Sequence, residues 1–271
     1  MTILDRIIET KRREVADAKA RTRLARLRER IERLDPPRDF QAAVAGGVLG
    51  EVRLIAEIKK ASPSAGLIVP DFDPVRIARV YQDHGAAALS VLTDETYFQG
   101  RLSYIADVKR AVDLPVLRKD FLIDEYQVYE ARAAEADAVL LIAECLDDQS
   151  LSVLAETASL LRMSILVEVH TEENLARVFG ALGSPKEAGF LLGINNRDLT
   201  AQRTDPATMS RLAAQLPRGT PFVAESGIGS REDVLTARRA GACAVLVGES
   251  LLRAPDVGTK VEELLGWIRL A

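Results

Sequence analysis

The sequence predicts an α/β fold, a (β/α)8 barrel with an additional N-terminal helix, formed by residues 1–271 as a single domain. Eight short apolar segments alternate strictly with helical segments at a period of roughly 25 residues, which is typical of parallel strands joined by helices. The 271 residues suffice for eight such units. An open doubly wound sheet is the main alternative, but it requires a glycine-rich turn after the first strand, and none is present.

The first part of the chain predicts a charged amphipathic helix from residue 2 to about residue 34. Its apolar stripe consists of Ile3, Leu4, Ile7, Ile8 and Val15. Pro36 and Pro37 end it, because proline cannot continue a helix. We expect residues 1–45 to form a helical extension packed on the surface of the barrel. Whether the helix covers the barrel mouth is left open.

The remaining elements follow in strict alternation. The predicted strands are Leu54–Lys59, Ala87–Leu92, Pro115–Lys119, Ala138–Ile142, Ile165–Val169, Phe190–Asn195, Phe222–Glu225 and Ala244–Val247. The predicted helices are Asp73–Asp83, Ser103–Ala111, Asp124–Glu135, Asp148–Leu161, Thr171–Phe179, Pro206–Gln215, Ser230–Ala240, Glu249–Leu252 and Val257–Arg269. Asp73, Thr171 and Ser230 have side chains suited to cap the first turn of a helix.

Composition narrows the class of protein. The chain is 48% hydrophobic and 28% charged, with a net charge of -4 and no basic tract, so nucleic acid is not an expected partner. It has no run of 18 apolar residues and no secretory signal, so we expect a cytoplasmic protein that does not enter a membrane. Two cysteines and two histidines argue against a disulfide framework and against a zinc site.

Polar side chains recur at the carboxyl ends of the predicted strands, where barrel enzymes place catalytic groups. Because strand side chains alternate, one set faces inward at the mouth: Glu57, Lys59, Lys119, Glu168, Asn195 and Glu225. Four of them come two residues after an inward residue that is expected to fill the barrel: Lys119 after Leu117, Glu168 after Leu166, Asn195 after Gly193 and Glu225 after Val223. Clustered lysines and carboxylates shift one another's pKa values, which suits acid and base catalysis. A structural ring of ion pairs is the alternative, and six such residues at one end favour catalysis.

A phosphate site is predicted beside this set. Ser226 and Gly227 follow the seventh strand, and Gly248, Glu249 and Ser250 follow the eighth at the start of a short helix. Glycine lets backbone N–H groups approach an anion, and we expect the backbone of Glu249 to face it. The hydroxyls of Ser62 and Ser64 are further donors in a mobile loop after the first strand.

Other residues carry weaker signals. Phe98 and Phe121 follow strands two and three, and their spacing is equally consistent with clasping an aromatic ligand and with core packing. His170 is expected to be a surface or supporting residue, and Cys145 has no histidine partner in the sequence that would make it a nucleophile.

The chain resembles the indole-3-glycerol phosphate synthases over nearly its whole length. The resemblance rests on an ordered set of segments: residues 3–11 (ILDRIIETK), 57–64 (EIKKASPS), 90–93 (SVLT) with Tyr97 and Phe98, 117–121 (LRKDF), 140–142 (LLI), 166–170 (LVEVH), 193–199 (GINNRDL), 224–228 (AESGI) and 247–250 (VGES). Any one of these segments occurs elsewhere, whereas the ordered set is specific.

The resemblance implies closure of 1-(2-carboxyphenylamino)-1-deoxyribulose 5-phosphate to indole-3-glycerol phosphate, CO2 and water, without cofactor or metal. It implies that Lys119 is the general acid, that Lys59 holds the substrate carboxylate and acts in the dehydration, and that Glu168 or Glu57 is the base, with Asn195 and Glu225 completing the polar set. The implied phosphate ligands are Ser62, Ser226, Gly227, Gly248 and Glu249. The other implied substrate contacts are Phe98, Phe121, Leu140 and Ile142 around the anthranilate ring, with Arg197 and Leu199. It also implies a monomer, and leaves open an association with other tryptophan-pathway enzymes.

Two other functions fit the same residues. One is a Schiff-base aldolase acting on a sugar phosphate through Lys119 or Lys59. The other is a barrel that binds a phosphosugar without turnover. A related isomerase of the same pathway would need a cysteine and an aspartate as acid and base at strand ends, and Cys145 is too isolated to support it.

Overall fold

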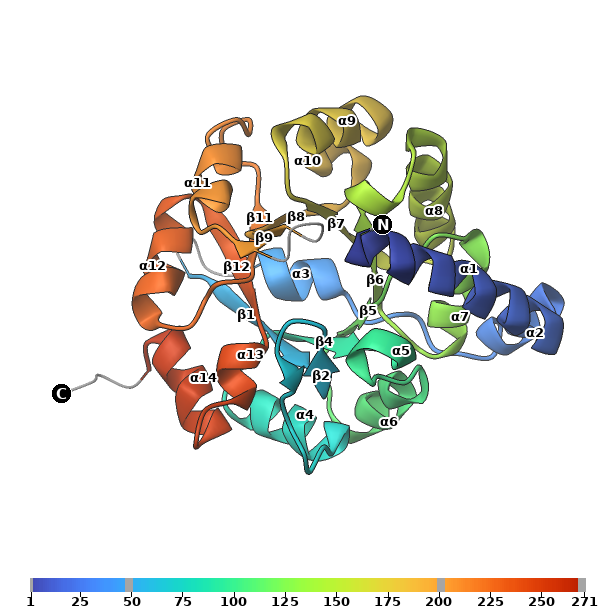
Figure 1. The fold of residues 1–271 in the computed structure, drawn as a ribbon, viewed down its shortest axis with the longest axis horizontal. Helices are drawn as coiled ribbons and strands as arrows, with labels where there is room; N and C mark the ends of the chain where they lie inside the picture. Colours follow the sequence, from blue (N-terminus) through green and yellow to red (C-terminus); the bar gives the residue numbers. More distant parts are fainter. Residues whose placement is uncertain (1, 47–50, 199–202, 268–271) are drawn as a thin grey trace.

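The computed structural model describes residues 2–46, 51–198 and 203–267 and confirms the predicted (β/α)8 barrel (Figure 1). Eight parallel strands close in the order β1-β12-β11-β8-β7-β6-β5-β4. They are β1 (Arg53–Ile58), β4 (Ala88–Leu92), β5 (Val116–Lys119), β6 (Ala138–Ile142), β7 (Ser164–Val169), β8 (Leu191–Asn195), β11 (Phe222–Glu225) and β12 (Ala242–Val247). Each overlaps the strand predicted at its position.

Helices surround this barrel (Figure 1). They are α4 (Pro74–Asp83), α6 (Ser103–Ala111), α7 (Glu125–Ala133), α8 (Asp148–Leu160), α9 (Glu172–Leu182), α11 (Ala207–Ala213), α12 (Arg231–Arg239) and α14 (Val257–Leu265). Asp73, Thr171 and Ser230 cap α4, α9 and α12 as predicted, each side chain accepting a hydrogen bond from a first-turn N–H group. None of the described helices has the length and apolarity needed to cross a membrane.

Alternate residues of the strands fill the barrel interior. On β1, Ile55 belongs to the interior cluster, while Leu54 and Ala56 belong to the cluster between strands and helices. The interior cluster includes Ala88, Leu117, Ala138, Leu140, Leu166, Leu191, Val223, Ala244 and Leu246. This inward parity continues at the carboxyl ends of the strands, where the inward side chains become polar.

A short helix, α3 (Phe40–Ala45), closes the amino-terminal end of the barrel. Phe40 and Val44 are fully buried and belong to the same cluster as Ile55. Burying the Phe40 side chain contributes about 2–3 kcal/mol. The Asp39 carboxylate accepts a hydrogen bond from the Ala42 N–H group and so fixes the start of α3. The last part of the predicted extension therefore plugs the barrel.

The prediction of one helix over residues 2–34 is wrong, because the segment forms α1 (Ile3–Arg21) and α2 (Leu24–Ile31). Thr22 is extended, and the Tyr126 hydroxyl lies 3.1 Å from the Ala18 carbonyl oxygen and 2.9 Å from that of Thr22. Leu27 then packs on Tyr126, which turns α2 onto α7. A tyrosine on a distant helix thus stabilises the break.

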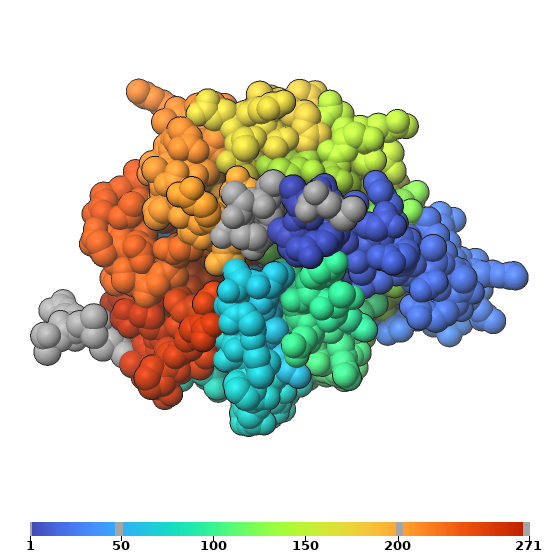
Figure 2. All heavy atoms as spheres, viewed as in Figure 1, coloured from blue at the N-terminus to red at the C-terminus, as the bar shows by residue number. Residues whose placement is uncertain are grey.

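The first turns of α1 lie at the carboxyl end of the barrel. Leu4 and Ile7 are buried in the same interior cluster as Phe121 and Ile142. Figure 2 shows the atoms of α1, in dark blue, beside the cyan residues that follow β1. The sequence left open whether this helix covers the barrel mouth. The structure places the first turns of α1 there, because Leu4 and Ile7 pack with side chains of the mouth.

Short elements lie in the connections between strands and helices. Two hairpins, β2 (Ala61–Ser62) with β3 (Gly66–Leu67) and β9 (Arg197–Asp198) with β10 (Arg203–Thr204), follow β1 and β8. The other short elements are α5 (Glu95–Phe98), η1 (Ala143–Cys145), α10 (Pro185–Ala188) and α13 (Glu249–Leu252). The mobile loop expected to carry Ser62 and Ser64 is therefore part of a paired hairpin whose first strand is buried.

Candidate active site

A cavity of about 540 Å³ opens at the carboxyl ends of the strands. All but one of the side chains expected at the site line it: Glu57, Lys59, Ser62, Phe98, Lys119, Phe121, Leu140, Ile142, Glu168, Asn195, Arg197, Glu225, Ser226, Gly227, Gly248 and Glu249. Leu199 lies outside the described residues. We call Glu57, Lys59, Lys119, Glu168, Asn195 and Glu225 the polar ring.

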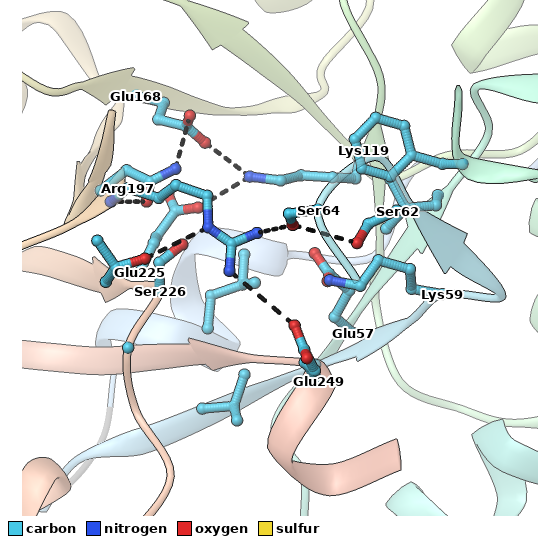
Figure 3. A pocket seen from close by; sticks show the side chains of 18 of the residues that line it. Glu57, Lys59, Ser62, Ser64, Lys119, Glu168, Arg197, Glu225, Ser226 and Glu249 are labelled. Carbon is cyan, nitrogen blue, oxygen red and sulfur yellow. Dashed lines mark hydrogen bonds and ion pairs between the residues drawn. The ribbon is translucent and has the colours of Figure 1, made fainter. Parts of the chain in front are cut away.

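Lys119 lies at the centre of the polar ring, at the end of β5 (Figure 3). Its Nζ is 2.6 Å from Glu168 Oε2 on β7 and 2.8 Å from Glu225 Oε2 on β11. Burial disfavours the ammonium ion, but the charges of Glu168, Glu225 and Glu57 outweigh burial and raise the pKa of Lys119. Lys119 is therefore a protonated donor. A lysine that forms Schiff bases needs the opposite shift.

The two glutamates beside Lys119 differ in protonation. Burial raises the pKa of both, but Lys119 and His170 outweigh it at Glu168 and hold the pKa of that carboxyl well below its usual range. At Glu225, burial and the charge of Glu168 prevail over the attraction of Lys119, so its pKa is raised. One carboxyl is thus an anion and its neighbour tends to keep a proton. Such divergence is the usual basis of an acid and base pair.

The other end of the polar ring comes from β1 and β8. Lys59 Nζ donates to Glu57 Oε1 at 2.5 Å, and Asn195 Nδ2 donates to Glu168 Oε1 at 3.0 Å. Two glycines make room for the carboxylates of Glu57 and Glu225. A Cβ at Gly248 would lie 2.4 Å from Glu57 Oε1, and a Cβ at Gly193 would lie 2.3 Å from Glu225 Oε1. The expectation that Gly193 fills the barrel is therefore corrected.

Apolar side chains form one wall of the cavity. The rings of Phe98 and Phe121 are 6.2 Å apart and inclined at 39°, and both line the cavity. Leu140 and Ile142 continue this wall along β6. The sequence left ligand contact and core packing open for the two phenylalanines. In the structure both pack on the interior cluster and also border the cavity, so ligand contact stays a prediction. The wall suits a flat aromatic group.

The opposite end of the cavity presents backbone groups after β11 and β12. Ser226 and Gly227 both have a positive φ, 61° and 74°, and the serine is an uncommon residue for that conformation. Gly248 precedes the first turn of α13, and its neighbour Glu249 turns its carboxylate to Arg253, with Oε1 3.0 Å from Arg253 Nε. The Glu249 carboxylate is therefore directed to Arg253 and not to its own backbone, and the anion contact expected of that backbone stays a prediction.

Two arginines border this end. Arg197 donates from Nη1 to Ser64 Oγ at 3.2 Å, and Arg253 donates from Nη2 to the Ala65 carbonyl at 3.3 Å. Both therefore contact the hairpin that follows β1. Sequence reasoning missed Arg253, although its spacing of four residues from Glu249 on a short helix is a signal of an ion pair.

His170 is not a surface residue, because it is 7% exposed behind Glu168. Its Nδ1 lies 2.8 Å from Glu144 Oε2 and its Nε2 lies 3.3 Å from Glu168 Oε1. Both are ion-pair contacts and not hydrogen bonds. Burial lowers the pKa of His170, but the two glutamates outweigh burial and raise it to about 10. The imidazolium therefore supports the anionic form of Glu168.

Three further features concern residues outside the polar ring. Leu4 and Ile7 of α1 line the cavity, and sequence reasoning assigned them only to a surface stripe. Burial raises the pKa of the Cys145 thiol, which agrees with the expectation that it is not a nucleophile. Among the described residues, no three His, Cys, Asp or Glu side chains are arranged to hold a metal ion.

Comparison of structures supports the fold. The barrel is similar to 3-hexulose-6-phosphate synthase from Salmonella typhimurium, with a TM-score of 0.63 and 16% identity over 79% of this chain and 97% of that one. It is also similar to orotidine 5'-phosphate decarboxylase from Pyrococcus horikoshii, with a TM-score of 0.58 and 15% identity over 80% of this chain and all of that one. At such low identity these similarities show the fold alone.

Comparison of sequences shows the family. The family model described as indole-3-glycerol phosphate synthase matches residues 4–264. The chain is 49% identical over 265 residues to the indole-3-glycerol phosphate synthase of Rhodopirellula baltica, covering 98% of this chain and 99% of the relative. It is 46% identical over 273 residues to that of a Roseiflexus species, covering 98% of both. The chain belongs to the indole-3-glycerol phosphate synthase family.

Proposed function

We propose that this chain is an indole-3-glycerol phosphate synthase, which closes 1-(2-carboxyphenylamino)-1-deoxyribulose 5-phosphate to indole-3-glycerol phosphate with loss of CO2 and water. Family membership over nearly the whole chain supports the activity. One observation supports it independently: Lys119 contacts two glutamates of opposite pKa shift between an apolar wall and a backbone-lined end of one cavity. The cavity then offers one region for each part of the reaction. The polar ring suits proton transfer, the apolar wall suits an aromatic ring, and the backbone-lined end suits a phosphate.

In the proposed complex, the anthranilate ring lies against Phe98 and Phe121, and the phosphate lies near Ser226, Gly227 and the start of α13. The distance between these two ends orients the ketone toward the polar ring. Lys59 holds the substrate carboxylate through its ammonium group. Holding both ends converts the ring closure into a step between oriented groups, which lowers its entropic barrier.

Ring closure requires a proton for the ketone oxygen. As the aromatic carbon bonds to the carbonyl carbon, Lys119 donates a proton to the oxygen, and the resulting hydroxyl stays at that carbon. The carbon–carboxylate bond then breaks, CO2 leaves, and its electron pair restores the aromatic ring. Lys119 recovers a proton from solvent, since a carboxylate leaving as CO2 consumes one proton overall.

Dehydration follows at the same carbon. Lys59 protonates the departing hydroxyl, the nitrogen lone pair assists its loss as water, and a base removes a proton from the adjacent carbon to form the indole. We propose Glu168 as that base, because its depressed pKa keeps it anionic, while Glu57, whose Oε1 lies 2.5 Å from Lys59 Nζ, orients the Lys59 ammonium group. Lys59 then takes a proton from solvent, and Glu168 releases to solvent the proton that it accepted, so both groups return to their starting states.

The activity is tested by indole fluorescence. The purified chain, incubated with the carboxyphenylamino substrate and EDTA, is expected to produce indole-3-glycerol phosphate and an equal amount of CO2. Product formation in EDTA also tests the proposed independence from metal. Substrate binding without product would contradict the proposal and favour a barrel that only binds phosphosugars.

We also propose that residues 1–271 form one domain and act as a monomer in the cytoplasm, alone or in association with other enzymes of tryptophan biosynthesis. Light scattering on the eluting protein is expected to give a single species near the chain mass of 29.6 kDa. A species of twice that mass would contradict the monomer.

His170 offers a pH test of the proposed base. The variant His170→Asn removes the cation 3.3 Å from Glu168 and leaves that carboxylate with less support, so the pKa of Glu168 rises. The acidic limb of the kcat/KM profile is therefore expected to move to higher pH by about one unit. Measurement of kcat/KM from about pH 3 to about pH 8, which extends below and above the ordinary glutamate pKa of about 4.3, follows this limb.

The other histidine of the chain provides the control. His84 is half-buried outside the cavity, with Nδ1 2.8 Å from Glu262 Oε1, so His84→Asn is expected to leave the limb unchanged. Because the folded pKa of His170 is raised to about 10, the stability it contributes is full below its ordinary pKa of about 6.5 and is lost as pH rises through 10. His170→Asn should therefore lower Tm more at neutral pH than above pH 10. An unmoved acidic limb would refute the role of His170.

A further inference from the structure

Lys11 of α1 is a buried cation outside the polar ring. The residue is 3% exposed, although it lies in a helix rich in exposed charges. Its Nζ is 2.8 Å from Asp94 Oδ2, 2.9 Å from Asp120 Oδ1 and 2.8 Å from Glu14 Oε2. A buried ammonium group is costly unless it is paired, so these contacts constrain where α1 can lie on the barrel.

The two aspartates that pair with Lys11 each hold the backbone of a cavity phenylalanine. Asp94 Oδ1 accepts a hydrogen bond from the Phe98 N–H group at 3.1 Å. Asp120 Oδ1, the same oxygen that contacts Lys11, accepts one from the Phe121 N–H group at 2.9 Å. A single ammonium group therefore joins the two segments that carry the aromatic wall.

Asp120 is held in place by other residues of the barrel. The other oxygen of Asp120 accepts from Thr93 Oγ1 at 2.6 Å and from Arg118 Nη2 at 3.1 Å. Arg118 in turn donates from Nη1 to Glu130 at 2.9 Å. These contacts hold Asp120 in place beside Lys119. Because Lys11 pairs with Asp120, the position of Lys11 is fixed relative to the polar ring.

The same face of α1 reaches the cavity. Leu4 and Ile7 precede Lys11 by seven and four residues, a spacing that aligns side chains on one face of a helix. Both line the cavity, whereas Lys11 does not. The ion pairs of Lys11 therefore set the depth at which Leu4 and Ile7 enter the mouth.

We infer that Lys11 is a positioning residue for the aromatic end of the substrate site. Through Asp94 and Asp120 it fixes the distance between Phe98 and Phe121, and through α1 it seats Leu4 and Ile7 beside them. This inference rests on the proposed function for the identity of the aromatic ligand. Without the ammonium group, Asp94 and Asp120 repel each other and the wall opens, while the acid and base groups of the polar ring stay in place.

The test compares a ligand with the ring and one without it. In Lys11→Met, the Ki of an N-alkylated anthranilate is expected to rise about tenfold, because a shift of the wall of an ångström or less is enough for such a loss. The Ki of inorganic phosphate is expected to change less than about twofold, and kcat less than about threefold, since neither depends on this wall. Both ligands are measured as competitive inhibitors and by direct calorimetry.

Lys19 of the same helix is the matched control. It pairs with Asp124 at 2.7 Å but is half-exposed and remote from the cavity, so Lys19→Met is expected to leave both Ki values unchanged. Lys11→Arg, which keeps a cation, should restore most of the affinity for the anthranilate. Asp94→Asn keeps the cap on Phe98, weakens the tie to Lys11, and is expected to give the same ring-specific loss if Lys11→Met fails to fold.

Two results would overturn the inference. One is a folded Lys11→Met protein that binds the anthranilate as tightly as the parent, which would make the ion pairs purely structural. The other is an equal loss for phosphate and anthranilate, which would indicate a general opening of the mouth. Calorimetry needs no turnover, so a parent protein that forms no indole product would contradict the proposed function without deciding the role of Lys11.

Discussion

Lys119→Met is expected to lower kcat by about a thousandfold while the Kd of the substrate changes less than about threefold. The variant keeps the length and apolar stem of the side chain but removes the proton that we propose for the ketone oxygen. Binding survives because the aromatic wall and the phosphate end do not depend on Lys119. Stopped-flow indole fluorescence gives kcat, and calorimetry with a non-cyclising substrate analogue gives Kd.

A paired lysine that does not line the cavity provides the control. Lys109 Nζ lies 2.6 Å from Asp137 Oδ1 at the opposite end of the barrel. Lys109→Met is expected to lower the free energy of unfolding by about 3–5 kcal/mol, because it removes the ammonium group that pairs with the buried Asp137 carboxylate, and to leave kcat within about twofold. If Lys119→Met retained a tenth of the parent kcat, the assignment of Lys119 as general acid would be wrong.

Glu168→Gln is expected to lower kcat by about a hundredfold or more. Glutamine keeps the volume and the contact with Asn195 but cannot accept a proton. The loss of the anion also removes the strongest attraction on the Lys119 ammonium, so the pKa of Lys119 falls. Single-turnover indole formation measures the effect, with calorimetry to establish that the substrate still binds.

Glu225→Gln gives the contrast. The raised pKa of Glu225 means that its carboxyl tends to carry a proton, which glutamine imitates, so kcat is expected to fall less than about tenfold. A raised carboxyl pKa also destabilises the fold as pH rises above the ordinary carboxyl range. Glu225→Gln should therefore raise Tm relative to the parent more at alkaline than at acidic pH. Equal losses of kcat in the two variants would contradict the different roles of the two glutamates.

The barrel was predictable because its signals are local. Strand and helix segments alternate at a regular period, and helix caps such as Ser230 lie next to the elements they begin. Side-chain parity along each strand then brought Lys119, Glu168 and Glu225 to one mouth without any structural information. The same parity shows which residues face inward, but not whether such a residue fills the barrel. Gly193 faces inward and instead leaves space for the Glu225 carboxylate, which the prediction missed.

The contributions of α1 were not predictable because their partners are distant in sequence. The helix ends at Arg21 because Tyr126, a residue of α7, contacts its last carbonyl oxygens. Lys11 appears in sequence as one more charge on an amphipathic helix, and only the fold brings it to Asp94 and Asp120. An isolated charged residue gives no sign of burial until its counter-charges are located.

Electrostatic roles also required the fold. The sequence offered Glu168 and Glu57 as equivalent bases, since a carboxyl pKa depends on burial and on charges from other strands. The contact of His170 with Glu168 was absent from the prediction. The imidazole lies between Glu168 and Glu144, and Glu144 comes from the end of the preceding strand, so its position depends on the fold. Residue type and spacing thus predicted which side chains line the cavity, and tertiary contacts gave the direction of their pKa shifts.

Lys119 is proposed to give a proton and to form no covalent bond with the ketone. Borohydride added during turnover, followed by mass spectrometry of the intact chain, tests this most directly, because it traps any Schiff base as a stable adduct. The expected result is an unmodified chain together with indole-3-glycerol phosphate as product. A chain that gains the mass of the substrate at Lys119 or Lys59, and loses activity in step, would contradict the acid role and indicate an aldolase-type mechanism.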